Sequence, residues 1–390
     1  MNLLFLIGVY PNYGGTEKIT TLLANEFTRR GHSVSIVSFD QPYPELAERE
    51  LNPSIRLHRL TYPVDTSGNR LKLRSIIREE RTDIVINQWC LPYYVTRLIN
   101  YARKGSGCRL ISVLHGVPDK SKRIIVAEDA IANASNSIKR LVCKAKYHLF
   151  QTVIKRSIRY VYNHSDRYVV LSDGFIHSLQ QYTGLSNTPK LLAIGNPVTI
   201  QVDYKVDYAG DKRKQILYVG RMDMENKRVN RIVEAWEVVH NDYPDWQLTL
   251  VGDGPHRRQL QQYSEEHHIQ RITFTGFVKE EPVSFYKQAT VLMLTSDLEG
   301  FGLVIVEGMS YGVVPVVYGS YVSVYDIITD GEDGFITPMP YSRDATVSCL
   351  RRIMDNPELA KRMSRNAREK SKRFSVDSIV AQWEELFKTI

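Results

Sequence analysis

Twelve short apolar runs rich in β-branched residues recur along this chain, with helical patterns between them. In the first half they are Leu3–Val9, Val34–Phe39, Ile55–Leu60, Ile84–Asn87, Leu110–Leu114 and Tyr168–Leu171. In the second half they are Ile216–Val219, Leu248–Val251, Ile272–Thr275, Val291–Leu294, Val313–Val317 and Phe335–Thr337. Apolar runs without alternation are typical of strands buried on both faces, as in parallel sheets covered by crossover helices. Each half is therefore predicted to be a doubly wound α/β domain.

The length of 390 residues exceeds what one hydrophobic core usually serves, which also favours two domains. Gln201–Lys214 is polar and turn-rich without a period, as expected of a linker. The predicted division is residues 1–198, a linker at 199–214, a second domain at 215–373 and a C-terminal helix at 374–390. Ser375 is the expected N-cap of that helix, and Trp383 and Phe387 lie on its apolar face.

The composition, with 43% apolar and 24% charged residues, is that of ordinary globular domains and excludes disordered or coiled-coil chains. The chain contains no apolar run long enough to span a membrane, and its first residues lack a basic leader, so we expect neither secretion nor membrane insertion. The four cysteines lie far apart, which fits neither a disulfide framework nor a zinc knuckle. A reducing cytoplasm is the expected location.

Positive charge is concentrated in the first half of the chain. Residues 1–196 carry 27 Lys and Arg against 15 Asp and Glu, a balance of +12, whereas the remainder carries −4. Ten of these cations lie between Lys120 and Arg159, among them Lys139, Arg140, Lys144 and Lys146. Such a stretch fits an anionic membrane surface or an acidic acceptor, or is simply a solvated face. Aromatic residues do not alternate with the cations as in nucleic-acid modules, so no nucleic-acid partner is expected.

Two apolar stripes with helical spacing run through the same basic stretch. One comprises Ile138, Leu141, Val142, Ala145 and Leu149, and the other comprises Tyr147, Phe150, Ile154, Ile158 and Val161. Either both stripes belong to the core, or one packs on the domain and the other enters a membrane interface. In the membrane alternative, we expect the stripe that contains Tyr147 and Phe150 to face the lipid.

Ligands of doubly wound folds bind beyond the carboxyl ends of the strands, so the residues after each strand are the candidates for function. Gly14 and Gly15 follow the first strand and open a helix, where free amides and the helix dipole favour an anion. A tight turn without a ligand explains the same pair equally simply. The dinucleotide fingerprint GxGxxG is absent at this position, which argues against a nicotinamide dehydrogenase.

Charged residues follow two strands of the second half. Gly220 and Arg221 come directly after Val219, with Lys227 six residues later, and two such cations can clamp a diphosphate. Glu299 and Glu307 flank an apolar segment and lie about 12 Å apart along a helix, too far to share one proton. A carboxylate on a helix as apolar as that of Glu307 requires a partner.

In these residues the chain resembles the retaining glycosyltransferases of family 4. Glu299 to Glu307 matches the E-x7-E motif of that family, and further matching segments follow in the family's order. They are Gly14–Glu17, Leu114–Gly116, Gly195–Pro197, Tyr218–Arg221, Leu250–Pro255, Gly276–Val278 and Asp333–Phe335. The resemblance implies the GT-B fold, in which two Rossmann-like domains face each other. It also implies that the C-terminal domain holds the donor and the N-terminal domain the acceptor, and that the C-terminal helix at 374–390 packs back on the N-terminal domain.

The resemblance assigns roles to individual residues of the donor site. Arg221 and Lys227 would neutralise the diphosphate, and Glu307 would bind the ribose hydroxyls. Glu299 would hold the transferred sugar together with the amides of Phe301, Gly302 and Leu303. The backbone near Val278 would read the base, His115 would lie beside the reacting face of the sugar, and Gly14, Gly15 and Gly220 complete the expected donor contacts.

These features predict a metal-independent hexosyltransferase that uses a nucleoside-diphosphate sugar, with UDP as the expected nucleotide. The acceptor would be a glycan or lipid-linked hydroxyl in surface polysaccharide assembly, at the cytoplasmic face of the membrane. Fixed cations and a helix N-terminus can stabilise the leaving diphosphate in place of a metal, although Asp297-Leu298-Glu299 resembles an acidic metal motif. A sugar-nucleotide epimerase and a catalytically silent binding subunit are the alternatives.

Two departures from the family pattern lie near the expected donor. Glu307 is followed by Gly308 where the family commonly has alanine. The segment Ser320–Asp326 lacks the Gly-Gly-x-x-Glu that the family often has there. The identity of the transferred sugar is therefore left open by the sequence.

Overall fold

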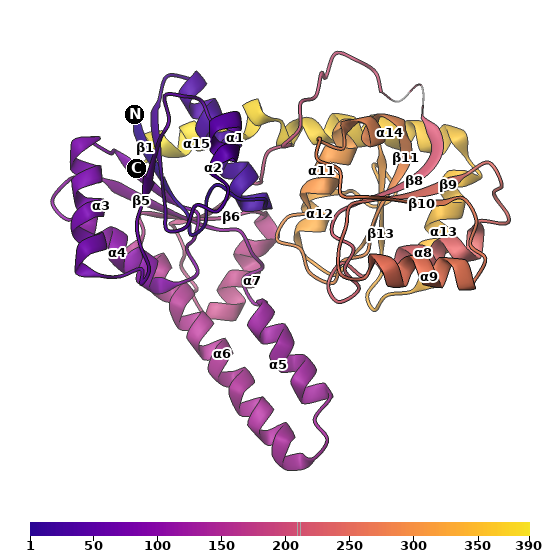
Figure 1. Ribbon diagram of the computed structural model, residues 1–390, viewed down its shortest axis with the longest axis horizontal. Helices are drawn as coiled ribbons and strands as arrows, with labels where there is room; N and C mark the ends of the chain where they lie inside the picture. The colour runs from indigo at the N-terminus through magenta and orange to yellow at the C-terminus, as the bar shows by residue number, and fades with distance from the viewer. Residues whose placement is uncertain (209, 211) are drawn as a thin grey trace. The chain divides into compact units, whose positions relative to one another are not determined.

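A computed structural model describes residues 1–208, 210 and 212–390 of the chain (Figure 1). The chain forms two compact units, one of residues 1–196 with 379–390 and the other of residues 197–378. Ala209 and Asp211, within the segment predicted as a linker, lie outside the described residues. The described residues of that segment belong to the second unit, so the prediction of a separate linker is wrong: the hydroxyl of Tyr311 donates to the carbonyl of Gln201, and Arg368 donates to the carbonyl of Val206.

The first unit contains a seven-stranded parallel sheet in the order β3-β2-β1-β4-β5-β6-β7. Its strands are β1 Asn2–Leu6, β2 Ser33–Ser38, β3 Arg56–Arg59, β4 Ile84–Asn87, β5 Arg109–Leu114, β6 Arg167–Val170 and β7 Leu191–Ala193. Its helices are α1 Gly15–Arg29, α2 Pro44–Glu50, α3 Ser67–Glu79, α4 Tyr93–Arg103, α5 Lys122–Ala132, α6 Ser137–His164 and α7 Asp173–Thr183. A core of buried side chains from β1, β4, α3 and α4 includes Leu4, Val85, Leu73 and Leu98.

The second unit contains a six-stranded parallel sheet in the order β10-β9-β8-β11-β12-β13. Its strands are β8 Arg213–Val219, β9 Gln247–Val251, β10 Ile272–Gly276, β11 Ala289–Leu294, β12 Val314–Tyr318 and β13 Phe335–Thr337. Its helices are α8 Val229–Val239, α9 Arg257–Glu266, α10 Val283–Gln288, α11 Leu303–Ser310, α12 Ser323–Ile327, α13 Arg343–Met354 and α14 Pro357–Ser371, with a short 3-10 turn at Lys372–Phe374.

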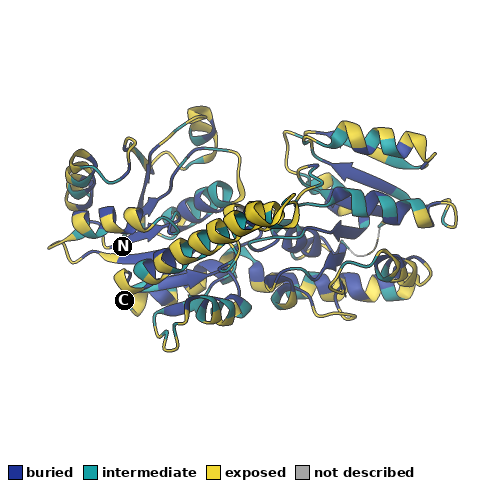
Figure 2. Ribbon diagram, turned by 90° about the horizontal axis from the view of Figure 1, so that it is seen from below, coloured by how far each residue is buried: buried dark blue, intermediate teal, exposed yellow. Residues whose placement is uncertain are grey.

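The prediction of two doubly wound parallel α/β domains is confirmed. Each of the twelve apolar runs coincides with a strand, and most of the strand residues are buried (Figure 2). Strand β7 was missed because its three residues, Leu191–Ala193, form too short a run to stand out from a loop. It pairs at the sheet edge with β6.

The C-terminal helix α15, Val376–Lys388, has the capping that its sequence predicts, since the Ser375 hydroxyl accepts a hydrogen bond from the Ser378 amide. Residues 379–390 belong to the first unit. There the ring of Phe387 lies 5.3 Å from that of Phe27, and Glu384 pairs with Arg30 at 3.1 Å. The apolar face of the helix is therefore buried against α1. Figure 1 shows the two helices next to each other near the N-terminus.

Helices α5 and α6 pack along each other as a hairpin that projects from the first sheet (Figure 1). In α6 the stripe that contains Phe150 and Ile154 is partly covered, and Ile158 is fully buried. The expectation that this stripe faces lipid is therefore wrong. The other stripe is exposed instead: Ile138 is 77% exposed and Leu149 59%. Periodicity alone does not reveal how a 28-residue helix packs against its neighbours. That packing decides which stripe is covered.

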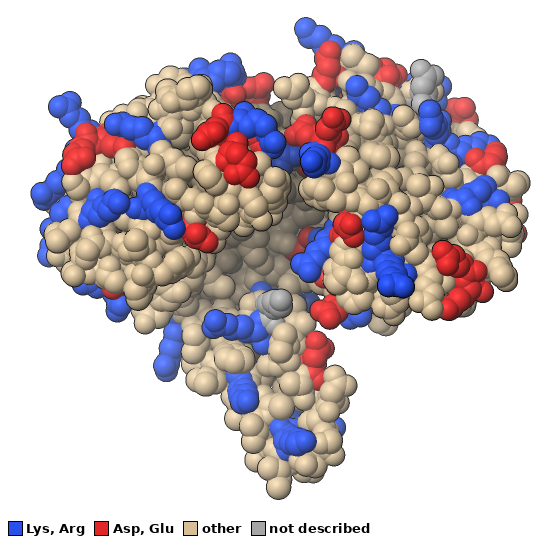
Figure 3. All heavy atoms as spheres, viewed as in Figure 1, with Lys and Arg blue, Asp and Glu red and all other residues tan. Residues whose placement is uncertain are grey.

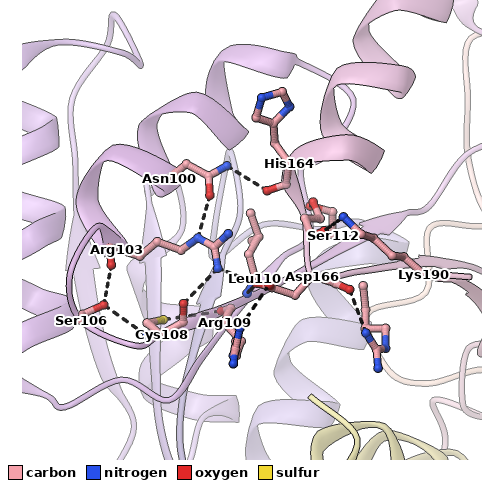
Figure 4. Close-up of polar contacts among 12 residues, drawn as sticks. Asn100, Arg103, Ser106, Cys108, Arg109, Leu110, Ser112, His164, Asp166 and Lys190 are labelled. Carbon is pink, nitrogen blue, oxygen red and sulfur yellow. Dashed lines mark hydrogen bonds and ion pairs between the residues drawn. The ribbon is translucent and has the colours of Figure 1, made fainter.

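The base of this hairpin is fixed by a polar network around Asp166, immediately after α6 (Figure 4). Its carboxylate pairs with Arg103 at 2.5 Å and accepts from the Leu110 amide at 2.7 Å. Asn100 on α4 donates to the carbonyl of His164, the last residue of α6, at 3.0 Å. Partial burial alone would raise the pKa of Asp166, but the Leu110 amide and Arg103 outweigh it and lower the pKa. The hairpin is thus anchored to β5 and α4.

Candidate functional site

The charged residues of the second unit gather beyond the carboxyl ends of three adjacent strands, β8, β11 and β12. Gly220 and Arg221 follow β8, and the loop 295–302 follows β11. The segment from Gly319 to Val322 follows β12. Because parallel strands end at one edge, these three loops meet there, where ligands of doubly wound folds bind. We treat this edge as the candidate site.

Lys227 and Glu299, separated by 72 residues in sequence, form an ion pair with Nζ 2.5 Å from Oε1. Asn226 holds the two segments together by donating from Nδ2 to the carbonyl of Leu298 at 3.2 Å. Both side chains of the pair are mostly shielded from solvent. The Lys227 ammonium and the Glu299 carboxylate are therefore fixed side by side at this edge. There the ammonium can bind a phosphate, and the carboxylate can accept a hydrogen bond from a sugar hydroxyl.

Asp297 does not share this position with Glu299. Its two oxygens are taken by Arg228, at 2.5 Å, and Arg231, at 2.6 Å. In addition, the described residues contain no group of three or more His, Cys, Asp or Glu side chains placed to hold a metal ion. The two carboxylates of the Asp297-Leu298-Glu299 triplet therefore pair with different cations.

The loop after β11 ends in Gly302, the N-cap of α11, with φ +94°. This left-handed conformation favours glycine, and a Cβ there would also lie 2.9 Å from the Ile305 side chain. The first amides of a helix have no intrahelical acceptor, so those at the start of α11, including Leu303, are available to an anion. Phe301 is itself buried, with its ring 5.6 Å from Phe374. The loop is therefore held rigidly at the helix start.

Glu307, one turn further along α11, is 6% exposed and has two protein partners. The hydroxyl of Thr199 donates to Oε1, and the hydroxyl of Tyr286 donates to Oε2 at 2.9 Å. Burial and then the charge of Glu307 raise the pKa of Tyr286 well above its usual value, which keeps this phenol a donor. The sequence argument that this carboxylate needs a partner is confirmed. The partners themselves lie 108 and 21 residues away in sequence, beyond the reach of local patterns.

The remaining predicted donor residues lie on the neighbouring loops. Arg221 is exposed, and its carbonyl accepts from the Tyr218 hydroxyl at 2.7 Å, which fixes the turn after β8. Gly220 packs so closely against the next loop that a Cβ on Gly252 would lie 2.0 Å from the Gly220 carbonyl oxygen. Val278 follows β10, at the far edge of the same sheet.

His115 belongs to the first unit, just after β5. Its Nε2 contacts the Oε1 of Gln88, which follows β4, the adjacent strand. Since an amide oxygen only accepts, Nε2 carries the proton and Nδ1 remains the acceptor. Burial lowers the pKa of His115 to about 4, so the ring is neutral at pH 7. Sequence reasoning missed Gln88, although its place after a buried strand marked it as a candidate.

Gly14 and Gly15 also belong to the first unit, at the start of α1. The carboxylate of Glu17 folds over this turn: its Oε2 would lie only 2.1 Å from a Cβ built on Gly14. Burial raises the pKa of Glu17. The anion at this helix start is thus a side chain of the protein, which an incoming phosphate would have to displace.

This arrangement defines a two-domain α/β protein whose second unit gathers charged side chains at the carboxyl ends of its strands. The sequence model described as Glycosyltransferase Family 4 matches residues 13–201, and the model described as Glycosyl transferases group 1 matches residues 204–370. The chain belongs to these glycosyltransferases and is an enzyme of the GT-B fold, which confirms both the resemblance and the predicted class of enzyme.

Full-length relatives agree with this assignment. An N-acetyl-α-D-glucosaminyl L-malate synthase of Bacillus anthracis is 24% identical, covering 99% of this chain and 97% of the relative. The Campylobacter jejuni GalNAc-α-(1→4)-GalNAc-α-(1→3)-diNAcBac-PP-undecaprenol α-1,4-N-acetyl-D-galactosaminyltransferase is 23% identical, covering 98% of this chain and 97% of the relative. The crystal structure of Anabaena Alr3699/HepE in complex with UDP shares the fold, with a TM-score of 0.76, 17% identity and full coverage of both chains.

Proposed function

We propose that the enzyme transfers a hexosyl unit from UDP-sugar to a hydroxyl of a glycan or lipid-linked acceptor, with retention of the anomeric configuration and without a metal ion. The observation that carries this proposal is the fixed Lys227–Glu299 pair beside the start of α11. It sets a phosphate-binding cation and a sugar-binding carboxylate at one point of the strand edge. The UDP bound by the Anabaena protein and the diphosphate-undecaprenol acceptor named for the Campylobacter enzyme support the choice of donor and acceptor class.

In the proposed reaction, the bond between the anomeric carbon and the β-phosphate oxygen breaks as the acceptor oxygen bonds to the same face of that carbon. The acceptor proton passes to the departing phosphate oxygen. Negative charge grows on the diphosphate, where Arg221, Lys227 and the α11 amides stabilise it. Glu307 accepts from the ribose hydroxyls with the lone pairs that Tyr286 and Thr199 leave unused, since each carboxylate oxygen can accept twice.

Metal independence is part of the proposal, supported by the pairing of Asp297 with Arg228 and Arg231. Activity is expected to survive EDTA. Complete loss that magnesium or manganese restores would contradict it.

Steady-state kinetics test the site assignment. Arg221→Ala should raise KM for the donor, whereas Glu299→Ala should mainly lower kcat, because a contact made only in the transition state appears in kcat. Arg228→Ala, which removes a partner of Asp297 and of the Met224 carbonyl but none of the predicted donor contacts, is the matched control. Wild-type kinetics in both site variants would refute the assignment. Donor isomerised without acceptor would identify an epimerase, and donor binding without turnover on any acceptor would identify a silent binding subunit.

We further propose that the α5–α6 hairpin places the enzyme on an anionic membrane at the cytoplasmic face. The exposed apolar stripe of α6 is flanked by Lys139, Arg140, Lys144 and Lys146, and Figure 3 shows cationic side chains over the projecting hairpin. Cations near an anionic leaflet contribute about 1 kcal/mol each, and apolar side chains at the interface add burial. None of the helices in the described part of the chain is long and apolar enough to cross a membrane.

Sedimentation with vesicles tests this proposal. Wild-type protein should pellet with anionic but not with neutral vesicles, and high salt should release most of it. Reversal of the four hairpin cations to Glu should abolish binding. The control reverses Lys72, Arg78, Arg81 and Lys104, which lie outside the hairpin in the same unit, and should retain binding. Equal pelleting with both vesicle types, or equal loss in both variants, contradicts the proposal.

A further inference from the structure

Tyr321, three residues after β12, is buried with a hydroxyl that has no partner. It is 4% exposed, and among the residues that the structure describes nothing hydrogen-bonds to its phenolic oxygen. A buried hydroxyl without a partner is costly, so such groups call for an explanation. The other tyrosine of the same segment, Tyr325, is exposed, and its hydroxyl donates to the Gly319 carbonyl at 3.3 Å.

The hydroxyl of Tyr321 lies at the start of α11. A Cβ built on Gly302, the N-cap of that helix, would lie 3.3 Å from the phenolic oxygen. Burial, and next the nearby Glu299 carboxylate, raise the pKa of Tyr321 well above its usual value, so the phenol keeps its proton. The hydroxyl is thus a donor that lies beside the free amides of α11 and near the Lys227–Glu299 pair.

We propose that the Tyr321 hydroxyl donates a hydrogen bond to the β-phosphate of the nucleotide donor, the phosphate that becomes the leaving group. This inference rests on the proposed function and deepens it. The amides at the start of α11 and the Lys227 ammonium, which is paired with Glu299, suit an anion rather than a sugar hydroxyl. The Glu299 carboxylate, whose charge also acts on Tyr321, remains for the sugar.

The comparison of UDP with UMP tests the proposal, because UMP lacks the β-phosphate. In titration calorimetry, Tyr321→Phe should weaken UDP binding about tenfold and change UMP binding less than about twofold. The melting temperature without ligand should stay the same or rise, since phenylalanine keeps the ring and removes an unsatisfied hydroxyl. Tyr325→Phe, the matched control, should change neither affinity.

The possible outcomes separate this inference from the proposed function. Wild-type protein that does not bind UDP contradicts the proposed function, and the inference fails with it. Wild-type binding of UDP together with unchanged UDP affinity in Tyr321→Phe overturns the inference alone. An equal loss of UDP and UMP affinity, or a lower melting temperature, assigns Tyr321 to packing and likewise overturns it.

Discussion

Removing the Glu307 carboxylate should destabilise the second unit as well as weaken donor binding. In Glu307→Ala the hydroxyls of Tyr286 and Thr199, both buried, lose their acceptor. A buried donor left unsatisfied costs about 1–3 kcal/mol, so the two together cost about 2–6 kcal/mol. For a unit of this size each kcal/mol lowers the melting temperature by about 2–4 °C, which predicts a fall of roughly 4–24 °C.

Glu307→Gln separates this structural effect from the ribose contact. The amide keeps the volume, and its oxygen accepts from one hydroxyl while its nitrogen donates to the other, so the cost should be about 1 kcal/mol or less. Scanning calorimetry of both variants measures the difference. Arg221→Ala is the control, because this exposed side chain should contribute less than about 1 kcal/mol to stability. Unfolding of Glu307→Ala at the wild-type temperature would refute the account of this buried carboxylate.

Three further outcomes follow from burial and charge. The lowered pKa of His115, about 4 against 6.5 in the unfolded chain, should make the free energy of unfolding fall as pH drops from 6.5 towards 4. Denaturant titrations of His115→Gln should lack this slope, and an unchanged slope would contradict the assignment. The lowered pKa of Asp166 predicts stability that is present above pH 4 and lost in stronger acid, measured as a flatter acid limb in Asp166→Asn. Truncation after Ser378 removes the contacts of Phe387 with Phe27 and of Glu384 with Arg30, so the first unit should melt earlier and expose apolar surface to a fluorescent dye. A truncated protein that melts like the full chain would mean that this helix contributes little.

Local patterns predicted much of the fold because they depend on burial within one element. An unbroken apolar run such as Val291–Leu294 is typical of a strand covered on both faces, and twelve of the thirteen strands in the described residues coincide with predicted apolar runs. The cap at Ser375 and the apolar face of α15 are equally local. Strand β7 escaped because three residues at a sheet edge carry too little pattern.

The location of the candidate site could be predicted from the sequence, but the contacts between its residues could not. The rule that ligands bind at the carboxyl ends of parallel strands led to Arg221, Lys227, Glu299 and Glu307, all of which lie on loops or helices after such strands. The pairing of Lys227 with Glu299 joins residues 72 positions apart. Gln88 beside His115 and Tyr321 beside Gly302 likewise come from separate strand ends.

The sequence by itself determined the two parallel sheets, the capped and amphipathic C-terminal helix and the demand of Glu307 for a partner, because each follows from the periodicity or polarity of one segment. Only the tertiary structure decided that Tyr286 and Thr199 meet that demand, that Ile138 and Leu149 rather than Ile158 face solvent, and that Tyr321 keeps a free hydroxyl. These outcomes depend on how distant segments pack, and packing sets the neighbours of a side chain through contacts that no local pattern encodes.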